Sequence, residues 1–168
     1  MKDRISRFFS RDNPERKASC ALARILSQFD METLSYREGI ADSRRNGDPR
    51  YVALGVWIIP CDSAQQDLEK SLDQMFDGVT FDLRRNGIGV LTRRSMPQSR
   101  VIIALPDKDN VWRFFQAIAC HQSARPGGWV LAGFRVERVV ELDNCHLVRF
   151  RNLIGENVPE ETVAATDW

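Results

Sequence analysis

The chain has 168 residues, of which 43% are hydrophobic, and this length predicts one domain with a sizeable core and an appendage. The formal net charge is +1, which argues against a DNA- or RNA-binding protein. No stretch of 18 apolar residues occurs and the N-terminus lacks an apolar signal segment, so we expect a cytoplasmic protein without membrane insertion. The four cysteines lie far apart in the sequence and are expected to be reduced, mostly buried thiols.

Residues 1–43 are expected to form a basic arm followed by an amphipathic helix. Asn13 suits the N-cap and Pro14 suits the first helical position. Apolar residues then recur every three or four positions to about Ser35, which gives the helix one apolar stripe. This stripe must be covered either by the rest of the chain or by a second copy, so a homodimer through the helix is one alternative.

From residue 44 to residue 155 the pattern changes from helical to β. Strands are expected over 51–59, 79–83, 88–90, 100–105, 111–121 and 129–142, and a last short strand over 146–150. The acidic segment 62–76 is either a short helix or an irregular excursion between strands. Six or seven strands without long intervening helices predict a mainly β protein, an antiparallel barrel. The acidic residues 156–168 are expected to form a flexible tail.

The segment 79–90 is the most informative stretch of the chain. Its apolar residues at 79, 81 and 83 alternate with polar ones, a pattern that predicts a half-buried strand with the apolar side chains inward. Asn86 and Gly87 tolerate positive φ and predict a sharp turn. Gly89 leaves room for another group to approach the backbone. The polar residues place a carboxylate and two guanidiniums beside the turn, which indicates a recognition surface.

These residues resemble the PilZ domain, a family of six-stranded β-barrels that bind the bacterial second messenger cyclic di-GMP. Asp82 and Gly87 match the ends of the family motif [D/N]xSxxG, and residues 129–134 are similar to its final GxxF strand. The resemblance covers about residues 44–142. The family serine falls at Arg84, and the linker before the first strand has a spacing of five between Arg45 and Arg50, where the family motif RxxxR has four.

The resemblance implies a non-enzymatic signalling module that binds cyclic di-GMP, needs no other cofactor or metal, and relays its ligand state to an unidentified protein partner. Seven residues are the candidate ligand contacts: Arg44, Arg45, Arg50, Asp82, Arg84, Arg85 and Gly87.

Elementary chemistry agrees with such a ligand. Arginine makes up 20 of the 24 basic residues, and its planar fork can grip a phosphate or the O6 and N7 atoms of guanine. Asp82 can accept hydrogen bonds from the N1–H and amino group of guanine. Arg84 either binds a phosphate or fills the site by pairing with Asp82. The alternative function is a degenerate PilZ-like adaptor that binds no nucleotide and acts through protein–protein contacts.

Two Cys-His pairs, Cys120-His121 and Cys145-His146, are the remaining candidates for chemistry. Four such ligands suit zinc, but neighbouring residues of a strand point to opposite faces, so each pair offers one ligand to a given side. No Walker loop, GxSxG or HExxH motif occurs in the sequence. The pattern therefore predicts neither a metal site nor an enzyme.

Overall fold

The computed structural model describes residues 13–33, 51–61, 68–96 and 100–156. The strands in these segments are β1 (Gly55–Pro60), β2 (Phe76–Arg84), β3 (Gly87–Thr92), β4 (Arg100–Pro106), β5 (Trp112–Arg125) and β6 (Trp129–Val140). The helices are α2 (Pro14–Thr33), α3 (Leu68–Asp73) and α4 (Asn144–Leu153), with one 3-10 turn, η1 (Pro126–Gly128), between β5 and β6.

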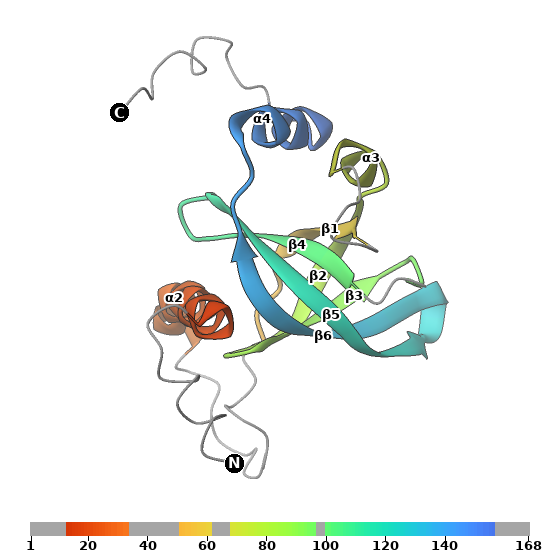
Figure 1. Cartoon of the computed structure of the whole chain (residues 1–168). Coiled ribbons are helices and arrows are strands. Elements are labelled where there is room, and N and C mark those ends of the chain that lie inside the picture. Colours follow the sequence, from red (N-terminus) through yellow and green to blue (C-terminus); the bar gives the residue numbers. More distant parts are fainter. Residues whose placement is uncertain (1–12, 34–50, 62–67, 97–99, 157–168) are drawn as a thin grey trace, which may run out of the picture.

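The six strands close into an antiparallel barrel in the order β1-β2-β3-β6-β5-β4 (Figure 1). The predicted mainly β barrel with an N-terminal helix is therefore confirmed. The described part of the chain has six strands, as the resemblance to PilZ domains implies. The division into residues 1–43, 44–155 and 156–168 stays a prediction.

Two hydrophobic clusters lie on the two sides of the barrel wall. The inner cluster fills the barrel, with Ile58, Ile103 and Phe115 fully buried. The outer cluster lies between the wall and the helices α3 and α4, and is built around Phe114 and Phe150. Because β4 is buried on both faces, its sequence is a continuous apolar run instead of an alternating one.

The helix α2 lies against the barrel and completes its inner core (Figure 1). The Asn13 side chain accepts a hydrogen bond from the backbone N–H of Glu15 at 3.0 Å, as expected of an N-cap. Ala18, Leu22 and Ile25 are buried together with side chains of the barrel. The barrel therefore covers this part of the apolar stripe, so these residues do not need a second copy of the chain to bury them.

The expected last strand over 146–150 is wrong, because the segment belongs to the helix α4. The Asp143 side chain accepts a hydrogen bond from the backbone N–H of His146 at 2.9 Å and caps the helix. Leu147, Phe150 and Ile154 then fall at helical spacing and pack in the outer cluster. The range 44–155 thus contains the helices α3 and α4 and the 3-10 turn η1 besides the barrel strands.

The expected inward side chains at 79 and 81 are also wrong. Val79 and Phe81 are 39% and 44% exposed, whereas Thr80 and Leu83 are buried. The pairing of β2 with β3 shifts between Thr80 and Asp82, so Phe81 is the extra residue of a β-bulge. A bulge changes which side chains of a strand face inward, and the simple alternation fails at this point.

The four cysteines all lie within the described residues and form no disulfide, but they are not mostly buried. Cys20, Cys120 and Cys145 are exposed, and Cys61 is partly exposed. Within the described residues, no helix combines the length and apolar character needed to cross a membrane.

Candidate functional site

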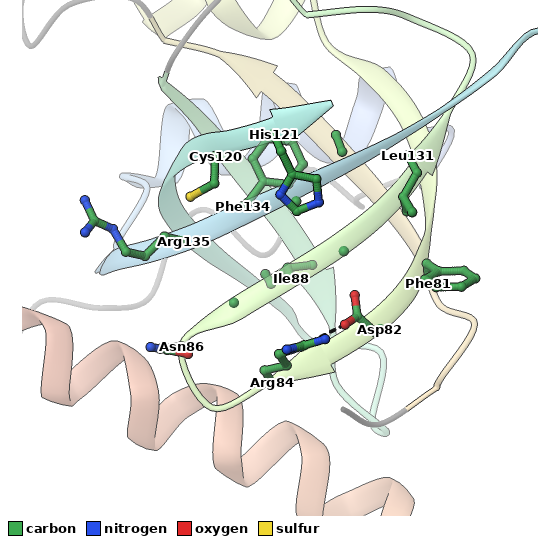
Figure 2. A pocket seen from close by; sticks show the side chains of 14 residues that line it. Phe81, Asp82, Arg84, Asn86, Ile88, Cys120, His121, Leu131, Phe134 and Arg135 are labelled. Carbon is green, nitrogen blue, oxygen red and sulfur yellow. Dashed lines mark hydrogen bonds and ion pairs between the residues drawn. The ribbon is translucent and has the colours of Figure 1, made fainter. Parts of the chain in front are cut away.

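A hollow of about 370 Å³ lies on the outer face of four neighbouring strands, β2, β3, β6 and β5 (Figure 2). Three of the predicted contacts, Asp82, Arg84 and Gly87, line it. The other lining residues are Phe81, Asn86, Ile88, Gly89, Cys120, His121, Leu131, Ala132, Gly133, Phe134 and Arg135.

Four of these residues form one row across the four strands. Asp82 in β2 is paired with Gly89 in β3, and Gly89 is paired with Gly133 in β6. Gly133 is paired in turn with His121 in β5. The middle of the row therefore has no side chains, while a carboxylate and an imidazole stand at its two ends.

Both glycines leave the space that the side chains at the ends of the row occupy. A Cβ atom added to Gly89 would lie 1.9 Å from Asp82 Oδ1, and one added to Gly133 would lie 2.1 Å from His121 Cε1. The Asp82 carboxylate and the His121 ring thus lean inward and cover the glycine backbone. The expectation that Gly89 admits a close approach is confirmed, and the approaching group is Asp82.

Two β-bulges orient the ends of the row. The register of β5 against β6 shifts between Ala119 and His121, as that of β2 against β3 shifts between Thr80 and Asp82. Each bulge inserts one extra residue, Cys120 in β5 and Phe81 in β2, and lets two consecutive side chains line the same hollow. The expectation that neighbouring strand residues point to opposite faces is therefore wrong at Cys120 and His121.

Asp82 and Arg84 form an ion pair at the edge of the hollow, with Arg84 Nε 2.9 Å from Asp82 Oδ2 (Figure 2). The Arg84 side chain is 28% exposed and that of Asp82 is 16% exposed. The pair uses Oδ2, while Oδ1 is the oxygen that lies over Gly89. One carboxylate oxygen thus meets the cation and the other faces the middle of the row.

The turn between β2 and β3 differs from the expected one. Arg84 pairs with Gly87, so the two turn residues are Arg85 and Asn86, and neither has a positive φ. A Cβ atom on Gly87 would lie 3.1 Å from the carbonyl oxygen of Phe134. Glycine at this position therefore serves the close approach of β6 and is not needed for a left-handed turn conformation.

Of the four remaining predicted contacts, only Arg85 belongs to the described residues. Arg85 is exposed at the turn, outside the set of lining residues. Arg44, Arg45 and Arg50 lie outside the described residues.

The segment directly after Arg50, residues 51–54, contacts β2 next to the hollow. The Tyr51 ring packs edge-on against Phe81, with centroids 5.8 Å apart. The Thr80 hydroxyl accepts a hydrogen bond from the N–H of Leu54 at 2.8 Å and donates one to the carbonyl oxygen of Val52. Tyr51, the residue bonded to Arg50, is therefore in contact with a residue that lines the hollow.

Sequence reasoning missed His121, Cys120 and Arg135 as lining residues. His121 and Cys120 were considered only as zinc ligands, and no sequence signal marked the bulge that turns both toward one side. Among the described residues, no three His, Cys, Asp or Glu side chains gather in a way that would hold a metal ion.

No family model and no curated protein sequence matches this chain. Among solved structures, the chain is similar to the inhibitor of motility MotI/DgrA of Bacillus subtilis, with 13% sequence identity and a TM-score of 0.45. The similarity covers 70% of this chain and 55% of that chain.

Proposed function

We propose that the hollow is a binding site for cyclic di-GMP and that the protein is a signalling module, which relays its ligand state to an unidentified protein partner. The observation that carries this proposal is that the Asp82 carboxylate lies over Gly89, in a hollow on the outer face of β2, β3, β6 and β5. Asp82 Oδ1 points toward the middle of the row, so it can accept a hydrogen bond from a base bound beside it in the hollow.

The cations around the hollow suit a ligand with two phosphates. Arg84 and Arg135 both line it, from strands on either side of β3. Arg50 is bonded to Tyr51, whose ring contacts Phe81 at the hollow. Guanidinium groups bind phosphate oxygens through strong, charge-assisted hydrogen bonds, so Arg44, Arg45 and Arg50 would add charge from the linker side.

The ion pair between Arg84 and Asp82 favours a second candidate, the adaptor that binds no nucleotide. In that case the 2.9 Å contact between Arg84 Nε and Asp82 Oδ2 fills the position that a ligand would need. The protein would then act through protein–protein contacts alone, with a homodimer as one possible assembly.

Calorimetry with cyclic di-GMP on the full chain tests the proposal. We expect the protein to bind, and Asp82→Ala to weaken binding about 10- to 100-fold, since it removes a charge-assisted hydrogen bond of about 1.5–3 kcal/mol. Asp77→Ala is the matched control, because Asp77 is an exposed carboxylate on the same strand outside the hollow. Equal weakening by both substitutions would contradict a contact at Asp82.

Substitution of Arg84 by serine separates the two candidates. If Arg84 binds phosphate, Arg84→Ser lowers the affinity for cyclic di-GMP; if Arg84 occupies the site by pairing with Asp82, the substitution raises it. If neither the wild type nor Arg84→Ser binds at high micromolar concentration, the nucleotide proposal is lost and the adaptor replaces it.

A further inference from the structure

His121 faces Asp82 across the two glycines, in a position that no part of the proposed motif assigns. A Cβ atom added to Gly133 would lie 2.1 Å from His121 Cε1 and 2.7 Å from each of the two ring nitrogens. Figure 2 shows His121 on the β5 side of the hollow and Asp82 on the β2 side. His121 is exposed, so no packing in the core accounts for its position over Gly133.

The distance across the row suits one edge of a ligand. Cβ positions of directly paired strand residues lie about 4.5–5.5 Å apart, and Gly89 and Gly133 are such a pair. Asp82 Oδ1 lies 1.9 Å from the Cβ position of Gly89, and the His121 ring nitrogens lie 2.7 Å from that of Gly133, so the two groups stand over neighbouring strands. Two neighbouring polar atoms of one heterocycle can therefore meet both groups at once.

The two groups have opposite hydrogen-bonding character. An ionised carboxylate only accepts, whereas an imidazole has at least one N–H donor in either protonation state. Their complement is an edge on which an N–H donor lies next to a carbonyl acceptor. Guanine has this edge, with the donor at N1 and the acceptor at O6. Adenine has the two in the reverse order, with the acceptor at N1 and the donor at its amino group, so an adenine in the same orientation would set each group against the wrong partner.

We propose that His121 is a specificity-determining residue, which donates a hydrogen bond to the carbonyl oxygen of a guanine base while Asp82 accepts from the neighbouring N–H. This inference rests on the proposed nucleotide function and adds a contact from β5 to it. Gly133 takes part indirectly, because only a residue without Cβ lets the imidazole lie at this position.

A double-mutant cycle on the full chain tests this role by calorimetry with cyclic di-GMP. His121→Ala and Gly133→Ala are each expected to weaken binding roughly 3- to 10-fold, the effect of one lost hydrogen bond. The double variant is expected to bind no more weakly than the single ones, because both changes remove the same contact. Ser123→Ala, an exposed position on the same strand outside the hollow, should bind like the wild type.

Two further measurements separate hydrogen bonding from ring packing and from misfolding. His121→Phe keeps a ring without an N–H donor and should bind as weakly as His121→Ala. The chain has two histidines, and His146 lies on α4 as an internal reference. In the wild type, cyclic di-GMP should shift the ring resonances of His121 and leave those of His146 in place, and cyclic di-AMP should bind at least 10-fold more weakly.

The outcomes distinguish the inference from the function beneath it. A wild type that does not bind cyclic di-GMP overturns both. A wild type that binds, with His121→Ala at unchanged affinity, His121→Phe at full affinity, no shift at His121, or equal affinity for cyclic di-AMP, overturns the role of His121 and leaves the proposed function standing. Additive losses of affinity in the cycle would show that Gly133 acts independently of His121, and would overturn the role assigned to Gly133.

Discussion

Thr80 is a buried polar side chain of β2 whose hydroxyl holds the segment before β1. It accepts from Leu54 N–H and donates to the Val52 carbonyl. Thr80→Val keeps the shape but leaves both backbone groups without this partner, so we expect it to reduce the free energy of unfolding by about 1–3 kcal/mol. Urea denaturation at neutral pH measures this loss, with Ser123→Ala, an exposed hydroxyl on β5, as the control; equal stability of the two variants would contradict the account.

At the scale of single residues, the sequence revealed one side of the site and missed the other. Asp82 and Gly87 were found because they match a motif, and Gly89 because a glycine in a strand signals a close approach. His121 was missed because its orientation depends on the bulge at Cys120. A bulge depends on the pairing of two distant strands, which the alternation within one strand cannot reveal.

The helix α4 depends on the cap that Asp143 provides. The hydrogen bond from the backbone N–H of His146 is the main reason that the pKa of the Asp143 carboxyl lies below its ordinary value of 3.8. Because the folded-state pKa is lower than the unfolded one, this contribution to stability is present at neutral pH and is lost as the pH falls through the folded-state pKa.

Thermal unfolding of Asp143 variants between pH 7 and pH 2 tests the cap. Asp143→Ala should lower Tm at pH 7, and its difference from the wild type should shrink at the acid end as the native carboxyl becomes protonated. Asp143→Asn keeps a neutral acceptor for the cap, so it should lose less at pH 7. A difference between Asp143→Ala and the wild type that stays constant over this range would contradict the role of the charge.

Among the elements, the strongly patterned ones were predicted and the ambiguous ones were not. The period of α2 and the apolar runs of β1 and β4 were sufficient to assign their type. The segment 146–150 is too short for its period to decide between strand and helix. What decides it is the cap at Asp143 together with Phe150, which packs against the outer face of the barrel.

At the scale of the whole molecule, α2 and the barrel share one core. Leu22 is fully buried within the inner cluster, so Leu22→Ala should reduce the free energy of unfolding by about 2–5 kcal/mol. Cys20→Ala is the control on the same helix, because Cys20 is exposed. Since the core is shared, circular dichroism should show one cooperative transition; a separate early transition of the helix would contradict this packing.

The central claim is that the row from Asp82 to His121 is a nucleotide site, and an NMR titration of the full chain with cyclic di-GMP tests it most directly. The backbone amide resonances of Gly89 and Gly133, which lie in the middle of the row, should shift in a saturable manner. The amide resonance of Gly55 should stay in place and serve as the reference, because Gly55 does not line the hollow and a Cβ atom added to it would have no neighbour within 4 Å. Saturable shifts confined to the hollow would support the account, whereas an unchanged spectrum, or shifts only at residues away from the hollow, would contradict it.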